Sequence, residues 1–117
     1  MRNTIKRHSD FAMTDADLTG RCAMFLVRAK PAKFVDDARY GLVVTKRTFR
    51  HAVDRNRAKR LLRDWIAFNE RYMCPDMDYI FVARHMILDT TREDGRTAMR
   101  KALHYIAKTH RNQNAEK

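Results

Sequence analysis

The chain has 117 residues, of which 44% are hydrophobic and 9% aromatic, enough apolar material for a single folded domain (1–117) and too little length for a second. The chain has 25 Lys and Arg residues against 14 Asp and Glu, so the formal net charge of +11 indicates a polyanionic partner. This composition excludes a disordered basic tail, and no apolar run approaches the roughly 20 residues of a membrane span. We expect no secretory signal, no membrane partner and no required protein partner.

The N-terminal part of the chain is predicted to hold one helix and two strands. A short helix is expected over about residues 4–11, followed by an acidic loop at residues 14–18. Residues 21–30 are apolar on both faces around Cys22–Val27, which indicates a central strand that Pro31 ends. Residues 39–47 are rich in β-branched and aromatic residues and predict a second strand, pairing with the first as a hairpin.

The C-terminal part is predicted to hold two helices and one strand. A helix is expected from Ala52 to Glu70, before Pro75, and a buried strand from Tyr79 to Ala83. The run from Thr90 to Glu93 has the form of a capping box. Apolar residues then recur at helical spacing to about residue 108, and residues 111–117 are expected to fray. This order predicts an α+β sandwich with helices on one face of a mostly antiparallel sheet, the other face staying free to bind.

Cysteines and histidines indicate no metal or catalytic site. Cys22 and Cys74 match no metal or redox spacing, so we expect free thiols in a reducing cytoplasm. The five histidines include no pair four residues apart, and His51 is expected to be a surface or capping residue. A protein-only nuclease would need a carboxylate cluster or paired histidines, and neither is visible. We therefore predict no catalytic residue and no metal ligand.

The predicted helix from Ala52 carries most of the functional information. Residues 46–63 contain one acid, Asp54, and eight of the 25 basic residues: Lys46, Arg47, Arg50, Arg55, Arg57, Lys59, Arg60 and Arg63. At about 100° per residue, one side of the helix is apolar and should meet the core. These core candidates are Ala58, Leu61, Leu62, Trp65, Ile66 and Phe68.

The opposite side of this helix is predicted to be a cationic stripe of Asn56, Lys59, Arg60 and Arg63, flanked by Arg55 and Arg57. Like charges four residues apart repel, and phosphates would offset that repulsion because arginine binds phosphate oxygens with two parallel hydrogen bonds. The alternative is a merely solvated helix face, but such faces normally mix charge signs. We therefore favour a nucleic-acid contact.

The sequence motif around this helix resembles that of a known family. Lys46-Arg47 followed by residues 52–64 matches a basic pair and A-x-x-R-N-R-x-K-R-x-x-R-[ED] of the bacterial ribonuclease P protein. Asp10-Phe11, residues 40–44 and residues 78–84 resemble further family elements, so the resemblance spans about residues 4–106. It implies an α-β-β-β-α-β-α fold with a four-stranded sheet and a left-handed β-α-β crossover, against the usual right-handed rule.

The resemblance also implies a function. In this family a catalytic RNA removes the 5′ leader of precursor tRNA, and the protein assists. The reaction uses Mg²⁺, which is bound mainly by the RNA. The family's basic helix corresponds here to Arg55, Asn56, Arg57, Lys59, Arg60 and Arg63, which would lie near the catalytic RNA. Phe11, Lys46 and Arg47 would line the cleft for the single-stranded leader, where an aromatic platform accepts any base.

The chain departs from the family at one position, and alternatives stay open. Members usually carry a second aromatic four residues after the first, where this chain has Asp15, so that contact could come from elsewhere, such as Phe25. Phe11 could equally be a core residue, and Asn56 a solvated one. A generic DNA- or RNA-binding module is the other candidate, although the second helix and turn of a helix-turn-helix are missing.

Overall fold

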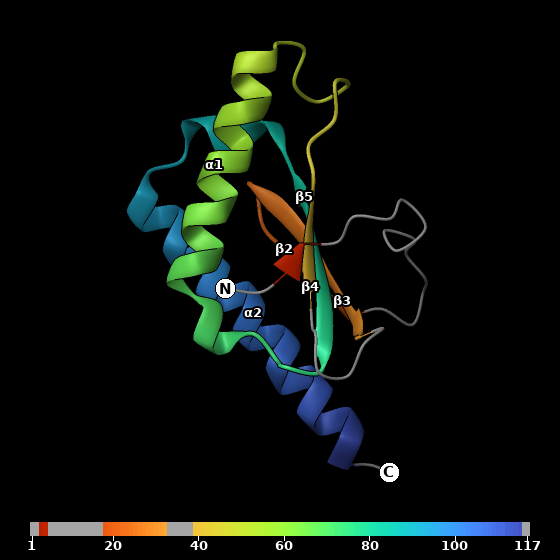
Figure 1. Cartoon of the computed structure of the whole chain (residues 1–117). Helices are drawn as coiled ribbons and strands as arrows, with labels where there is room; N and C mark the ends of the chain where they lie inside the picture. The colour runs from red at the N-terminus through yellow and green to blue at the C-terminus, as the bar shows by residue number, and fades with distance from the viewer. Residues whose placement is uncertain (1–2, 5–17, 33–38, 116–117) are drawn as a thin grey trace.

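The computed structural model describes residues 3–4, 18–32 and 39–115, which form one sheet and two long helices (Figure 1). The predicted N-terminal helix at residues 5–11 lies outside the described residues, and Thr4 belongs to a short strand instead. In chain order the elements are β1 (Asn3–Thr4), β2 (Leu18–Arg21), β3 (Phe25–Pro31), β4 (Arg39–Val43), α1 (Ala52–Phe68), η2 (Glu70–Tyr72), β5 (Met77–Ala83), η3 (His85–Asp89) and α2 (Arg92–Ala115).

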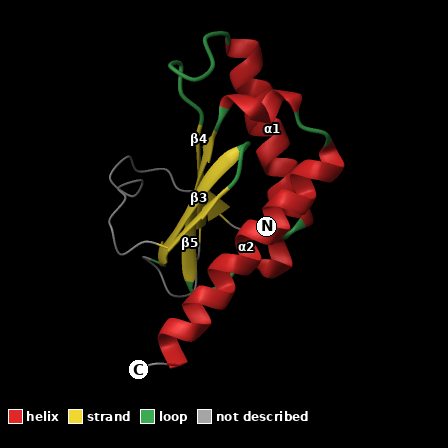
Figure 2. Ribbon diagram, turned by 180° about the vertical axis from the view of Figure 1, so that it is seen from behind, coloured by secondary structure: helices red, strands yellow, loops and turns green. Residues whose placement is uncertain are grey.

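The fold is α+β, with both long helices on one face of the sheet, as predicted (Figure 2). The strand order is β1-β4-β5-β3-β2. The sheet is mixed rather than mostly antiparallel: β2 and β5 run antiparallel to β3, whereas β5 and β1 run parallel to β4. The parallel pair follows from the connection, because α1 carries the chain from the end of β4 back to the start of β5. The hand of this crossover stays a prediction.

The predicted hairpin between the strands at residues 21–30 and 39–47 is wrong. β5 lies between β3 and β4, and β3 pairs with β2 instead. The apolar segment from residue 21 is not one strand, because β2 ends at Arg21 and the backbone N–H of Cys22 donates to the carbonyl of Phe25 at 3.0 Å. This turn contains neither Gly nor Pro, and its apolar residues therefore resembled a continuous strand.

Both long helices begin where the sequence indicates, but one cap and both ends differ. α1 ends at Phe68, two residues before the predicted end at Glu70. Thr91, not Thr90, caps α2: the N–H of Asp94 donates to Oγ1 of Thr91 at 3.1 Å. Thr90 instead donates its hydroxyl to the carbonyl of Met86 at 2.9 Å. The helix continues to Ala115, past the predicted end near residue 108 and through part of the predicted frayed tail.

The core lies between the helices and the sheet. Alternate residues of β3 (Phe25, Val27, Ala29) are fully buried, and the ring of Phe25 lies 6.3 Å from that of Trp65 in α1. Of the predicted helix core, Ala58, Leu62, Trp65 and Ile66 are buried and Leu61 is partly buried. Phe68 is the exception at 55% exposure, because on the last turn of α1 it lies beside Arg92 and Arg96 of α2 instead of being covered by the sheet.

A buried ion pair joins the two parallel strands at their N-terminal ends. The carboxylate of Asp78 in β5 is fully buried and accepts from the backbone N–H of Arg39 at 2.7 Å and from its guanidinium at 3.1 Å. Because an unpaired buried charge is costly, this contact fixes the register of β4 beside β5.

Candidate nucleic-acid interface

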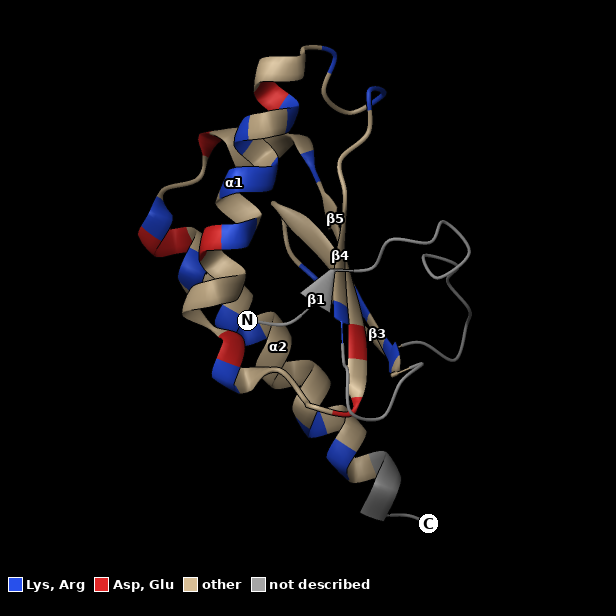
Figure 3. Ribbon diagram, viewed as in Figure 1, with Lys and Arg blue, Asp and Glu red and all other residues tan. Residues whose placement is uncertain are grey.

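The outer face of α1 carries the predicted cationic stripe, namely Asn56, Lys59, Arg60 and Arg63. The structure brings these four residues together: Asn56, Arg60 and Arg63 are exposed and Lys59 is partly buried, opposite the buried face around Trp65. Figure 3 shows in blue where Lys and Arg positions fall along the α1 ribbon. Arg57 is exposed beside them. Among the residues that the structure describes, no carboxylate forms an ion pair with any of these cations. The stripe therefore presents positive charge that the described part of the fold does not neutralise.

Arg55, predicted to flank the stripe, has a different role in the fold. Its Nη1 donates to the carbonyl of Phe49 at 2.9 Å and to that of Arg50 at 3.2 Å, and the side chain is partly buried. It ties α1 to the preceding loop. One sequence signal could have indicated this: a cation in the first turn of a helix meets the positive end of the helix dipole and needs a compensating contact.

The loop that Arg55 holds presents Lys46 and Arg47. Phe49 is buried and its ring stacks on His85 at 6.2 Å, while its N–H donates to the carbonyl of Thr45 at 2.9 Å. The intervening turn leaves Lys46 and Arg47 exposed. The turn leads into the N-terminus of α1, at the top of Figure 1. The two predicted basic residues of the cleft therefore precede the same helix as the stripe.

The third predicted cleft residue, Phe11, lies outside the described residues. The sheet face away from the helices carries two cations that sequence analysis did not single out, Arg28 and Lys30, both partly buried. They alternate with the buried residues of β3, and the i, i+2 alternation is the signal that could have found them. The first half of the segment is apolar on both faces, and this conceals the alternation in its second half.

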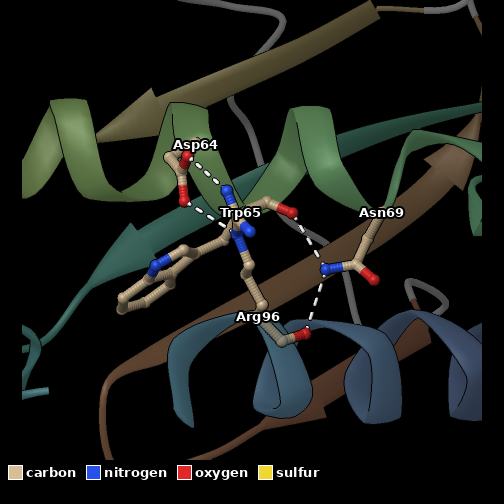
Figure 4. A network of polar contacts seen from close by, with 4 residues as sticks. All are labelled: Asp64, Trp65, Asn69 and Arg96. Atoms are coloured by element: carbon tan, nitrogen blue, oxygen red, sulfur yellow. Dashed lines mark hydrogen bonds and ion pairs between the residues drawn. The ribbon is translucent and has the colours of Figure 1, made fainter. Parts of the chain in front are cut away.

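The orientation of the stripe depends on how α1 packs against α2. Asp64 of α1 accepts two hydrogen bonds from the guanidinium of Arg96, at 3.2 and 3.0 Å (Figure 4). The buried amide of Asn69 donates from Nδ2 to the carbonyls of Trp65 and Arg96, each at 3.0 Å (Figure 4). These contacts join the two helices across their interface. They hold the outer face of α1 in a fixed orientation.

The described residues offer no metal centre of their own. Within residues 3–4, 18–32 and 39–115, no three His, Cys, Asp or Glu side chains gather where they could hold a metal ion. The same residues include no helix long and apolar enough to cross a membrane. Cys22 and Cys74 form no disulfide. His51 takes the N-cap position of α1 and is exposed, but its side chain makes no capping hydrogen bond.

Comparison with known proteins gives a consistent result. A family model described as Ribonuclease P matches residues 1–107. The Ribonuclease P protein component of Marinomonas sp. is 38% identical over 73 residues, covering 62% of this chain and 54% of that protein. The one of Nitrosomonas europaea is 49% identical over 61 residues, covering 50% of each. The chain thus matches about half the length of these two relatives.

A solved structure has the same fold. The RNase P protein of Staphylococcus aureus superposes with a TM-score of 0.72 at 25% sequence identity, covering 88% of this chain and 94% of that one. The similarity therefore extends from the basic helix to the sheet and α2.

Proposed function

The chain belongs to the ribonuclease P protein family, and we propose that it serves as the protein subunit of this enzyme. In this role it binds the catalytic RNA and the 5′ leader of precursor tRNA in the cytoplasm, and assists the endonucleolytic removal of the leader. The observation that carries the proposal is the stripe of Asn56, Lys59, Arg60 and Arg63, exposed on one side of α1 while the other side is anchored in the core.

Phosphate contacts are the natural use of this stripe. Each Lys or Arg that neutralises a phosphate releases condensed counterions, so binding gains free energy that falls as salt rises. The arginines can bind phosphate oxygens with two parallel hydrogen bonds, whereas Lys59 acts as a point charge. Because α2 holds α1 in place, the backbone under the stripe is already ordered before RNA binds, and binding costs little conformational entropy. A fixed cationic face of this kind suits a folded RNA.

The leader would bind beside the N-terminal end of α1. We assign Lys46 and Arg47 to its phosphates, since the turn that carries them is anchored by Phe49, and Phe11 to its bases. Contacts to backbone and base faces carry little sequence information, as leaders of varied sequence require.

We propose that Mg²⁺ is held mainly by the catalytic RNA and that the chemistry belongs to the RNA. The described residues provide no cluster of metal ligands. The cations of α1 would instead screen the repulsion between RNA phosphates that are brought close together, which makes the folded RNA less dependent on divalent ions.

A reconstitution tests this proposal. The full chain is added to the catalytic RNA of a bacterial ribonuclease P and a leader-bearing precursor tRNA, and cleavage is followed against Mg²⁺ concentration. We expect faster cleavage or a lower Mg²⁺ requirement. The double variant Arg60→Ala/Arg63→Ala should lose most of this gain, whereas Lys101→Ala/Arg111→Ala, which removes two exposed cations of α2, should keep it. No effect of the native chain would refute the proposal.

A second part of this experiment tests the alternative that the protein alone is a nuclease. The chain is incubated with the precursor and Mg²⁺ without any catalytic RNA. We expect no cleavage. Cleavage that persists through purification and scales with the protein concentration would instead make the chain a nuclease in its own right.

A further inference from the structure

The face between the two helices holds a groove that begins at the proposed RNA contacts and extends beyond them. Two adjoining depressions, of about 350 and 360 Å³, share Arg92 at the start of α2. The first is also lined by Arg57, Arg60 and Asp64, and the second by Phe68, Arg96 and Arg100. We call this feature the interhelical groove. Because Arg60 belongs both to the stripe and to the groove, the two surfaces are continuous.

The charge of the interhelical groove is strongly positive. Its lining includes five arginines, at positions 57, 60, 92, 96 and 100, against two carboxylates, Asp64 and Glu93. Asp64 is already engaged with Arg96. Among the described residues, no ion pair involves Arg92 or Arg100, and both are exposed. Arg92, Arg96 and Arg100 are four residues apart on one face of α2 and span about 12 Å, so they repel one another unless an anion lies across them.

Phe68 adds a feature that a purely electrostatic surface would lack. Its side chain, 55% exposed, is among the large hydrophobic side chains that the described fold leaves in solvent. The guanidinium of Arg96 lies over its ring, 4.2 Å from the centroid. Asp64 binds the same guanidinium through two hydrogen bonds, so the cation is held beside the ring. An exposed aromatic ring beside planar guanidinium groups is a platform on which a nucleobase can stack.

We propose that the interhelical groove is a second RNA-contact surface, which binds an unpaired segment of RNA with its phosphates on Arg92 and Arg100 and a base on Phe68. The inference rests on the proposed function, since it assumes that RNA already occupies the stripe and continues past Arg60. An acidic protein segment would match the charge as well, but a planar surface of ring and guanidinium groups fits a nucleobase better than it fits a carboxylate side chain. A paired helix would keep its bases from Phe68, so the bound segment is single-stranded.

Two sets of variants test this inference by equilibrium binding of the full chain to a bacterial ribonuclease P RNA across a salt series. Arg92→Ala/Arg100→Ala should lower the affinity and flatten the slope of log K against log salt by about 1.4–1.8, which corresponds to two lost phosphate contacts. Phe68→Ala should lower the affinity about five-fold or more without changing the slope, and Phe68→Trp should restore it. Lys101→Ala/Arg111→Ala is the charge-matched control, expected to keep the native slope. Thermal unfolding of each variant checks that the fold is intact.

The outcomes separate the two proposals. If Arg92→Ala/Arg100→Ala and Phe68→Ala bind as the native chain does while Arg60→Ala/Arg63→Ala still flattens the slope, the groove is not an RNA contact and the proposed function stands. Such a result would leave an acidic protein as the occupant to test. If Arg60→Ala/Arg63→Ala also has no effect, the proposed function itself fails. Loss of affinity in Phe68→Ala that Phe68→Trp does not restore would overturn the stacking contact.

Discussion

Gly95 of α2 lies directly against the indole of Trp65 of α1: a Cβ atom at position 95 would come within 2.0 Å of Cε2 and 2.1 Å of Cζ2 of that ring. Trp65 is fully buried, so the ring cannot move into solvent. Glycine is required here by close approach, not by an unusual backbone conformation, since no glycine among the described residues has a positive φ. The contact sets the distance between the two helices and thus the shape of the interhelical groove.

Gly95→Ala should therefore destabilise the protein. Alanine favours a helix by about 1 kcal/mol over glycine, but a clash this close with a buried ring lies at the upper end of overpacking costs, about 3 kcal/mol, so we expect a net loss of about 2 kcal/mol in the free energy of unfolding. Urea denaturation followed by circular dichroism measures this loss. Lys101→Ala, an exposed change on the same helix, should stay within about 0.5 kcal/mol of the native chain. A Gly95→Ala variant as stable as the native chain would show that the helices pack differently.

Substitution of Arg55 should mainly lower stability and substitution of Arg57 should mainly weaken RNA binding, although both residues belong to the predicted basic helix. Arg55→Ala removes the donor that holds the carbonyls of Phe49 and Arg50, and we expect it to cost about 1–2 kcal/mol of stability. Arg57→Ala removes an exposed cation and should change stability by less than about 0.5 kcal/mol while weakening RNA binding. Thermal unfolding and RNA titration of both variants test this division. Equal stability of the two variants would contradict the role assigned to Arg55.

Asp64→Asn should act in opposite directions on stability and on binding. The ion pair with Arg96 is about one-third exposed on both sides, so its loss should cost only about 0.2–1 kcal/mol. Removing this carboxylate also raises the net charge beside Arg57 and Arg60 and releases Arg96, so RNA should bind more tightly at low salt. Filter binding at two salt concentrations, together with urea denaturation, measures both effects. Weaker binding by a fully folded variant would show that the ion pair, rather than the charge, matters to RNA.

The basic helix could be predicted from the sequence because its signals are local. The apolar and basic residues of α1 alternate with the period of a helix, so Trp65 on one face and Arg60 on the other follow from spacing alone. The family motif around Asn56 additionally predicts that this helix contacts RNA. The roles of the individual predicted site residues in RNA binding stay predictions.

The sheet could be predicted only in part because strand pairing is non-local. The residues of β3 and β4 give no indication that β5, which follows β4 by more than 30 positions, inserts between them. The contact of Arg55 with the carbonyl of Phe49 was missed for a related reason: it depends on how the loop folds back on the helix. The same holds for Phe68, whose exposure is decided by the packing of α1 against α2 rather than by helical spacing.

The most direct test of the cationic stripe is the salt dependence of binding to a bacterial ribonuclease P RNA, compared between the native chain and Arg60→Ala/Arg63→Ala. Each arginine that contacts a phosphate contributes about 0.7–0.9 to the slope of log K against log salt, so the double variant should have a slope shallower by about 1.4–1.8 and a lower affinity at every salt concentration. An unchanged slope and affinity in this variant, with its fold intact, would contradict the account.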